Sequence, residues 1–279
     1  MKVGSEPKVQ QQAQAEEPKG PDESKDAKAP DDAKESPKSS GAGDGFEDPK
    51  PQAPVDLGDM RAQQDRCEAA NAGKPPPAGG YDMDDPDVQR ELTRTDEGKR
   101  MLQDWNALKA NGGIKTENHD FCRAAGGQWD GQSRTLLIDP KSYATEDGFF
   151  QTVAHEMTHA SQSDGLNPAR DGTAAPISDF KDADAWADHE MMNEARAEAR
   201  AYDLARDRQF PDSSFKDLRK AYDAVMDSGE GTVEERREKA IQAVTEAMKA
   251  NPKWQRERQT YVNDWNEWAA QSAASRAVP

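Results

Sequence analysis

The chain has 279 residues and carries 37 Lys and Arg against 54 Asp and Glu, a formal net charge of −17. Its hydrophobic content of 33% is well below the roughly 45% of an ordinary globular domain. Such an acidic chain is not attracted by charge to nucleic acid or to an anionic membrane. No apolar run approaches the ~18 residues of a membrane span, and the first residues lack the apolar segment of a secretory signal. We therefore expect no nucleic-acid partner, no membrane span, and a location in the cytoplasm or export by a non-Sec route.

The polarity is concentrated at the start of the chain. Residues 1–58 hold eight Lys, thirteen Asp and Glu, eight Pro and one aromatic residue, Phe46. This segment has too little apolar surface to offset the entropy lost on ordering, so a disordered tail is predicted, either a spacer or a leader that recruits partners. Residues 59–279 then form the folded domain. Its two cysteines, Cys67 and Cys122, are too few for a disulfide framework or an all-cysteine zinc site, and whether they are bridged stays open.

Helices make up most of the predicted domain. A short helix is expected over residues 59–72, followed by a run of Gly and Pro at 73–80, and a longer helix over 85–110. From Glu146 onward the pattern is helical, except for a loop rich in Gly, Pro and Asp near 164–180. The later helices are placed near 181–208, 213–228, 232–250 and 252–275. Aromatic residues recur on one side of the last helix, as in a face packed on the core: Trp254, Tyr261, Trp265 and Trp268.

Residues 114–140 differ from the rest and predict a small sheet. A first strand is expected at 121–124, and a hairpin about the turn dipeptide Asp130-Gly131 follows it. Since hairpin strands run antiparallel, the sheet as a whole is expected to be antiparallel. The predicted fold class is therefore α+β, mostly helical, with a small antiparallel sheet before the helix that begins near Glu146.

The sequence His155-Glu156-Met157-Thr158-His159 lies in that helix and carries the clearest chemical signal. Positions i and i+4 of a helix lie on one face, about 6 Å apart, so both imidazoles can reach one metal ion. Glu156 lies beside them, where it can take a proton from a metal-activated water. The chain has four histidines, and chance rarely places two of them in this arrangement. The motif predicts a hydrolytic zinc site.

A catalytic zinc needs a third protein ligand beside the two histidines, with one position left for water. The metzincin pattern requires Gly and His where this chain has Gln162 and Gly165, so that pattern is excluded. Further along, the segment Asn193-Glu194-Ala195-Arg196-Ala197-Glu198 lies in a helix dense in Ala and charged residues. Its carboxylates recur every four residues, which places them on one helix face.

This segment resembles the N-E-x-x-x-D segment of thermolysin-like zinc peptidases, the gluzincins. The resemblance implies that Glu194 is the third ligand and that Glu198 orients the imidazole of His155. Glu194 follows the second histidine of the motif by 35 residues. Glu198 itself, Asp164 and Asp188 are the alternatives for the third ligand.

The order of the motifs along the chain also resembles a family. A Gly126-Gly127-Gln128-Trp129-Asp130 hairpin strand, a Leu136-Leu137-Ile138-Asp139-Pro140 strand and the helical histidine motif follow one another. This order is similar to that of uncharacterised bacterial metallopeptidase domains with an H-E-x-x-H-x-x-Q helix. The likeness covers roughly residues 115–205. It implies a zincin-like domain with a helical extension over about 210–279, in which an edge strand pairs with an extended substrate.

Other residues near the motifs are candidates for a role in the site. His189 and Tyr202 flank the Glu-rich helix, and a His or Tyr stabilises the oxyanion in the peptidases that this chain resembles; the alternative for both is a structural role. Gln162 lies almost one turn past His159, which makes it a candidate for the pocket lining. Substrate specificity is expected from the pocket walls and from the loop 164–180.

Together these features predict a zinc-dependent peptidase of the gluzincin type. His155, His159 and Glu194 are expected to hold one Zn²⁺ per chain, and Glu156 to act as general base in the hydrolysis of a peptide or protein substrate. The rival hypothesis is a helical interaction or effector module whose metal site is vestigial, or structural with four protein ligands. A third hypothesis keeps the chemistry in a host-directed effector peptidase. The sequence does not predict an oligomeric state.

Overall fold

The computed structural model describes residues 79–121, 126–143, 145–210 and 215–276, and the structural statements below concern these residues. They belong to one structural unit, Gln52–Pro279. The predicted tail, the predicted helix at 59–72 and both cysteines lie outside the described residues. No helix in the described ranges combines the length and the apolar character needed to cross a bilayer.

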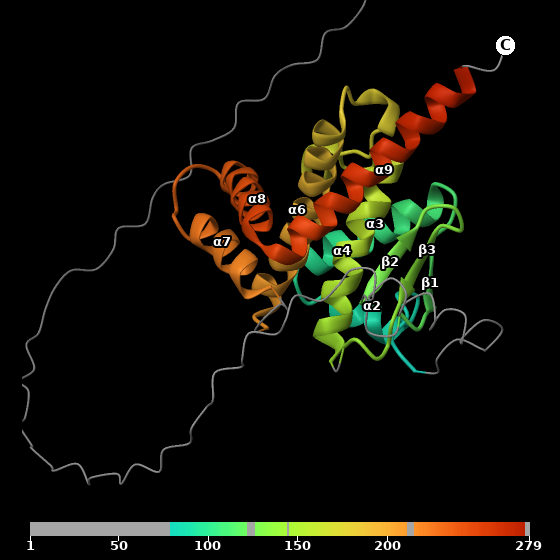
Figure 1. The fold of residues 1–279 in the computed structure, drawn as a ribbon. Coiled ribbons are helices and arrows are strands. Elements are labelled where there is room, and N and C mark those ends of the chain that lie inside the picture. Colours follow the sequence, from blue (N-terminus) through green and yellow to red (C-terminus); the bar gives the residue numbers. More distant parts are fainter. Residues whose placement is uncertain (1–78, 122–125, 144, 211–214, 277–279) are drawn as a thin grey trace, which may run out of the picture. The chain divides into compact units, whose positions relative to one another are not determined.

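The fold is α+β and mostly helical, as predicted, with one three-stranded sheet (Figure 1). The elements in chain order are α2 (Pro86–Leu92), α3 (Asp96–Ala110), β1 (Lys115–Asn118), β2 (Gly127–Asp130), β3 (Thr135–Ile138), α4 (Glu146–Asp164), α5 (Pro168–Asp171), the 3₁₀ helix η1 (Ile177–Asp179), α6 (Ala183–Arg208), α7 (Lys216–Met226), α8 (Val233–Ala250) and α9 (Pro252–Arg276). The later helices thus lie close to their predicted bounds, and the loop predicted at 164–180 contains α5 and η1.

The single helix predicted over 85–110 is wrong, because the chain forms two helices there. The first ends at Leu92, and Thr95 then caps the second by accepting a hydrogen bond of 3.2 Å from the amide of Gly98. A Cβ atom on Gly98 would lie 2.1 Å from the carbonyl oxygen of Leu92. The close contact between the two helix ends therefore requires glycine at this position.

The sheet has the strand order β1-β3-β2, and it is mixed rather than antiparallel. The predicted hairpin is confirmed, since β2 and β3 pair antiparallel across the turn that follows Asp130. The expectation of a wholly antiparallel sheet is wrong, because β1 lies on the other side of β3 and pairs with it in parallel. The first strand is also Lys115–Asn118 rather than 121–124; of that predicted strand, residues 122–124 lie outside the described ranges. The polar strand β1 is held by its pairing with the apolar strand β3, a cause that its own sequence does not show.

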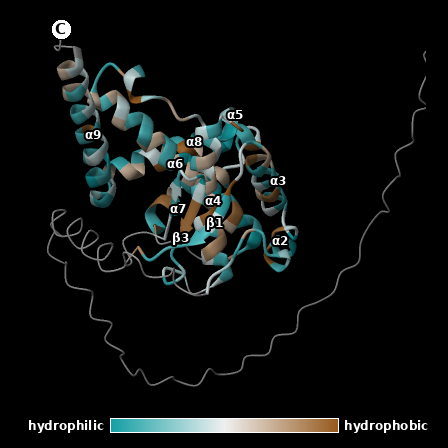
Figure 2. Cartoon of the chain, turned by 90° about the vertical axis from the view of Figure 1, so that its right-hand side faces the viewer, coloured by the Kyte–Doolittle hydropathy of each residue, from teal (hydrophilic) through white to brown (hydrophobic). Residues whose placement is uncertain are grey.

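Buried apolar side chains form two clusters that meet at α6. The first lies between α2, α3, the sheet and α4, and includes Trp105 and Phe150. The second lies between α6, α7 and α8, and includes Tyr202 and Tyr222. Leu204 of α6 belongs to the first cluster, so this helix serves both. Figure 2 shows hydrophobic residues gathered where α4 meets the sheet and hydrophilic residues over the outer helix faces.

The aromatic side of α9 contributes to the core over part of its length. Trp254 is buried in the second cluster, and Tyr261 packs against that cluster. Trp265 and Trp268 lie outside it and line a groove with Phe180 instead. The predicted core face is therefore correct for the first half of α9 and wrong for the second.

A buried group of charges ties α6 to α3 and α5. Arg200 has 1% of its side chain exposed; its guanidinium hydrogen-bonds Asp104 and lies 3.6 Å from Glu97 and 3.9 Å from Asp171. Arg170 pairs with Asp104 and with Asp171, the latter at 2.8 Å. Arg100 pairs with Glu97 at 2.8 Å, so three cations serve three buried carboxylates. Removing one of these cations leaves a buried negative charge without compensation, which is costly in a medium of low polarity.

Arg200→Met is expected to lower the free energy of unfolding by about 3–5 kcal/mol, because it strips the cation from buried carboxylates while keeping the apolar stem. Urea unfolding followed by circular dichroism measures this change. The control is Arg90→Met, since the side chain of Arg90 is 65% exposed and pairs with Asp87 one turn away; this variant is expected to lose less than about 1 kcal/mol. Equal losses in the two variants would contradict a role for the buried charge.

Strand β2 lies directly against α4 at Gly127. A Cβ atom on Gly127 would lie 2.7 Å from Cγ2 of Thr152 and 3.1 Å from Cγ of Glu156. A Cβ on the neighbouring Gly126 would meet its nearest atom, a Thr152 oxygen, at 3.4 Å, an ordinary contact. The absence of a side chain at Gly127 therefore sets how close the sheet comes to the histidine motif.

Gly127→Ala is expected to destabilise the fold by about 1–3 kcal/mol, because the added methyl group overpacks the contact between β2 and α4. Gly126→Ala is the matched control and is expected to cost less than about 1 kcal/mol, since its methyl group finds room. Thermal unfolding of both variants is the measurement. If Gly126→Ala proves as destabilising as Gly127→Ala, the close approach is not the cause.

Candidate metal centre

Helix α4 places its two histidines on the face opposite the first core. Its N-terminus is capped by Thr145, whose side chain accepts a hydrogen bond of 3.2 Å from the amide of Gly148. One side of the helix is buried in the core through Phe149, Phe150, Val153, Ala154, Met157 and Ala160. His155 and His159, one turn apart, project from the side that faces α6, with ring centroids 5.0 Å apart. Their Nε2 atoms are 3.2 Å apart.

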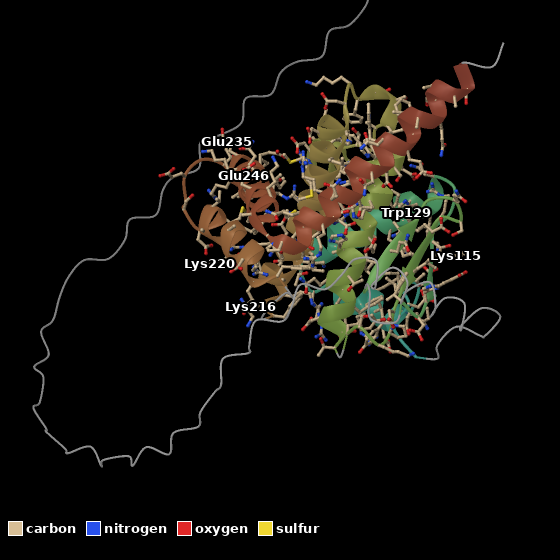
Figure 3. The ribbon with its side chains drawn as sticks, viewed as in Figure 1. Lys115, Trp129, Lys216, Lys220, Glu235 and Glu246 are labelled. Atoms are coloured by element: carbon tan, nitrogen blue, oxygen red, sulfur yellow. The ribbon has the colours of Figure 1, made fainter. Side chains whose placement is uncertain are left out.

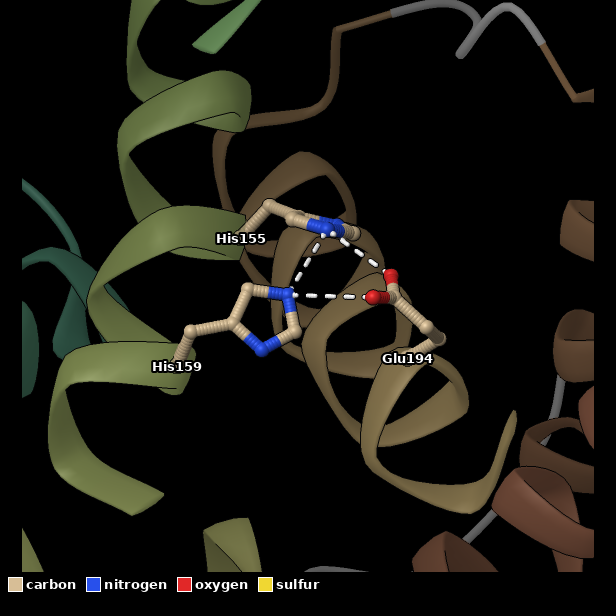
Figure 4. A group of neighbouring side chains, drawn as sticks. All are labelled: His155, His159 and Glu194. Carbon is tan, nitrogen blue, oxygen red and sulfur yellow. Dashed lines mark hydrogen bonds and ion pairs between the residues drawn. The ribbon is translucent and has the colours of Figure 1, made fainter. Parts of the chain in front are cut away.

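Helix α6 brings Glu194 to the same point (Figure 4). One carboxylate oxygen of Glu194 lies 3.3 Å from Nε2 of His155, and the other lies 3.6 Å from Nε2 of His159. Within the described residues, these three side chains are the group of His, Cys, Asp and Glu that could hold a metal ion. The helices α4 and α6 pack side by side, which brings residues 35 positions apart in the sequence into one cluster.

The spacing of these atoms fits a tetrahedral ion. With zinc bonds of about 2.0–2.1 Å, two ligand atoms of a tetrahedron lie about 3.3–3.4 Å apart. The three distances of 3.2, 3.3 and 3.6 Å in the cluster are close to this edge length. The residues therefore fit zinc in donor type, in number and in spacing.

Hydrogen bonds on the far side of His159 fix which ring nitrogen faces the cluster. The amide nitrogen of Gln162 donates to the backbone carbonyls of Asp171 at 2.8 Å and Asn193 at 3.2 Å. The amide oxygen of Gln162 is thereby turned toward His159, whose Nδ1 lies 3.0 Å away and donates to it. Nε2 of His159 is then left with its lone pair toward the cluster, as a metal ligand requires. Gln162, a candidate for the pocket lining, is buried behind His159 and does not line the pocket.

His155 has a carboxylate behind it in the same way. Nδ1 of His155 lies 3.5 Å from a carboxylate oxygen of Glu198, one turn past Glu194 on α6. Tyr202 is fully buried one turn further along α6, beside Glu198. Burial raises the pKa of Glu198, and the charge of His155 and the Tyr202 hydroxyl oppose this in part. Glu198 thus lies where the resemblance places the orienting acid, and Tyr202 lies behind it, away from the cleft.

The carboxylates around the histidines create a strong preference for positive charge. Burial acts to lower the pKa of His155, but the hydrogen bond with Glu194 and the charges of Glu156 and Glu198 raise it to about 10. Burial acts to raise the pKa of Glu194, but the two imidazoles hold it well below its usual range. The cluster is therefore an anionic pocket that favours a bound cation.

Glu156 lies beside the cluster and is held by the sheet. Its side chain is mostly buried, and a carboxylate oxygen accepts a hydrogen bond of 2.9 Å from the backbone N–H of Trp129 in β2. In the sheet, the amide of Asp139 donates to the carbonyl of Gly126, so by the alternation of antiparallel pairs Gly127 and Trp129 direct their polar groups to the free edge. The edge strand thus positions the carboxylate that the motif assigns as general base.

The cluster and Glu156 line one cleft of about 950 Å³. Its walls come from β2, where Trp129 lies (Figure 3), from α4 and α6, and from the first turns of α9. The loop 164–180, from which specificity is expected, contributes no residue to the described lining of this cleft. Neither does His189, which packs against Phe180 and Trp186.

The two aspartates considered as alternative ligands are engaged elsewhere. Asp164 forms a two-pronged pair with Arg134, with distances of 2.8 and 2.7 Å. Asp188 pairs with Arg258 at 3.1 Å. The structure thus brings Glu194, and neither aspartate, to the histidine pair.

Tyr261 of α9 is a site residue that the sequence analysis assigns to the core face. Its hydroxyl donates a hydrogen bond of 3.1 Å to Glu194. Burial and the charge of Glu194 raise the pKa of Tyr261, so it keeps its proton. The sequence indicates that one face of α9 carries polar groups, because Lys253, Glu257 and Tyr261 recur at intervals of four residues. Nothing in the sequence indicated that this face would meet α6.

No protein-family model, curated protein or solved structure matches the chain. What can be said of its function therefore depends on the geometry of this cluster.

Proposed function

We propose that the protein is a zinc-dependent peptidase of the gluzincin type. The observation that carries the proposal is the convergence of two Nε2 atoms and a carboxylate, at 3.2, 3.3 and 3.6 Å from one another, in a cleft that also contains Glu156. His155, His159 and Glu194 would hold the ion. Glu198 and Gln162 would fix the tautomers of the two imidazoles, as partners on the far ring nitrogen do in zinc sites.

A zinc ion in this cluster would supply a Lewis acid that makes water more acidic and polarises a carbonyl. The chain's own contribution is the proton transfer. The Glu156 carboxylate accepts a proton from the attacking water and delivers it to the nitrogen of the leaving amine. The amide of Trp129 orients this carboxylate at 2.9 Å, and the free edge of β2 offers backbone groups to which an extended peptide can pair.

The rival hypothesis, an interaction module with a structural metal, requires four protein ligands. Within the described ranges three side chains form the ligand group, and they face the cleft rather than a closed core. A cluster with three ligands and access to solvent is typical of a catalytic zinc site. This arrangement favours the peptidase over the structural alternative.

The first test compares zinc content with cleavage. The purified chain is expected to contain about one zinc per molecule and to cleave peptides, and Glu156→Gln is expected to keep the zinc while the rate falls by about 10²–10⁴-fold, because the general base is lost. Glutamine retains an oxygen that can accept the Trp129 amide. His155→Ala is expected to lose the zinc. Elemental analysis and cleavage of a quenched-fluorescent peptide library measure both quantities.

The control for this test is Glu246→Gln on α8, away from the sheet (Figure 3), which is expected to keep both zinc and activity. A wild-type protein that takes up no stoichiometric zinc would overturn the proposed function. A wild-type protein that binds zinc and cleaves no peptide of the library would favour the structural alternative.

The second test concerns the groups that orient the ligands. Tyr261→Phe and Gln162→Leu are expected to weaken zinc binding by about 10–100-fold, because each removes a hydrogen bond to a ligand side chain. Competition with a chelator of known affinity measures this change independently of activity. Tyr81→Phe is the control, since Tyr81 is exposed and does not line the cleft. Unchanged zinc affinity in both variants would show that these hydrogen bonds do not support the site.

A further inference from the structure

Helix α9 lies across α6 (Figure 1) and brings a lysine into the cleft. Lys253, in the first turn of α9, lines the cleft together with Phe215 and Trp254. Its ammonium nitrogen lies 4.2 Å from the centre of the Phe215 ring and 5.4 Å from that of Trp254. The two aromatic faces attract the cation and hold it in place.

The ammonium of Lys253 is held by aromatic contacts rather than by a direct counter-ion among the described residues. Within the described part of the chain, its ammonium has neither an ion pair nor a hydrogen bond. The other lysine of the cleft differs, because Lys141 pairs with Asp120 at 2.6 Å. Glu257 lies one turn further along α9 and acts on Lys253 by its charge, but too far away to form an ion pair.

The carboxylates nearest to Lys253 have other partners. Glu194 faces both imidazoles and accepts the hydrogen bond of Tyr261. Glu198 faces Nδ1 of His155 at 3.5 Å. Burial lowers the pKa of Lys253, and the charges of Glu198, Glu257 and Glu194 compensate in part. A partly buried ammonium without a direct counter-ion is unfavourable, and an anion that enters the cleft removes this cost.

We propose that Lys253 binds a carboxylate of the peptide substrate, in a subsite walled by Phe215 and Trp254. This inference rests on the proposed peptidase function and names the class of substrate. Two groups of a peptide carry the required chemistry: an acidic side chain near the scissile bond, and the α-carboxylate at the end of the chain. The aromatic walls exclude water from the ion pair and so strengthen it.

Equilibrium binding of matched peptides to the zinc-loaded Glu156→Gln variant of the 279-residue chain tests the proposal. The probes are fluorescently labelled hexapeptides with both ends blocked, which carry a single Glu or its neutral analogue Gln at each position in turn. A further pair has no acidic side chain and ends in a free carboxylate or in an amide. Fluorescence anisotropy gives the dissociation constants.

At one position, or at the free end, the acidic peptide is expected to bind about tenfold more tightly than its neutral partner. The position of this preference identifies the source of the carboxylate. Lys253→Met is expected to reduce the ratio to about one, and Lys253→Arg to retain part of it, because the cation is kept. Lys249→Met is the matched control, since it removes the same charge from α8, where Lys249 pairs with Glu246 outside the cleft; its ratio is expected to stay unchanged.

The proposal is overturned if the protein with Lys253 intact binds acidic and neutral peptides equally at every position and at the end, or if the preference survives in Lys253→Met. The first of these results needs no variant at Lys253, so it stands even if that variant fails to fold. Peptide cleavage by the wild type separates this inference from the function on which it rests. Cleavage without any preference for a carboxylate would overturn the subsite and leave the proposed peptidase function intact. Lys253-dependent binding without cleavage would support the carboxylate subsite and overturn the peptidase function.

Discussion

The proposed metal cluster depends on the register between α4 and α6. Its ligands come from these two helices, so a slip of one residue along either would separate Glu194 from the histidines. Gln162 fixes the register most directly, because it accepts from His159 and donates to the carbonyl of Asn193, the residue before Glu194. One side chain thus sets both the orientation of a ligand and its distance from the opposite helix. The residue just before it, Ser161 of α4, donates to Asp171 at 2.7 Å, and so joins the same helix to the buried charges around Arg200.

The buried carboxylates of the chain are paired with arginines around Arg200, whereas those around His155 have a different environment. Around Arg200, carboxylates from α3 and α5 are neutralised by arginines, and the result is a fixed helix packing. Around His155, no arginine of the described residues pairs with Glu194 or Glu198, and the field of the carboxylates raises the pKa of that imidazole to about 10. Buried negative charge of this kind favours a bound cation. The low hydrophobic content of the chain is consistent with a fold held together partly by buried ion pairs such as those around Arg200.

The sequence could predict the parts of the site that depend on local periodicity. The histidine pair follows from the i, i+4 geometry of one helix. The same spacing places Glu194 and Glu198 on one face of another helix, and their roles were predicted from the resemblance to the N-E-x-x-x-D segment. Parts that depend on how distant elements pack were not predictable. β1 pairs in parallel with β3, although β2 lies between them in the chain, and the polar sequence of β1 does not indicate this pairing. The sequence made Gln162 only a candidate for the pocket wall, and its place behind His159 becomes clear only from the two carbonyls that its amide reaches.

The largest difference between the role predicted from the sequence and the observed structure concerns α9. Its tryptophans suggest a helix that covers the core, and its first half does so through Trp254. Yet the residues that matter for the site lie at four-residue intervals on an adjacent face: Lys253, Glu257 and Tyr261. Tyr261 hydrogen-bonds a proposed ligand, while Lys253 and Glu257 line the cleft. The segment that carries the motifs ends well before α9, and it supplies the proposed catalytic groups and one wall of the cleft. The first turns of α9 supply the opposite wall, and the proposed peptide substrate would lie between the two.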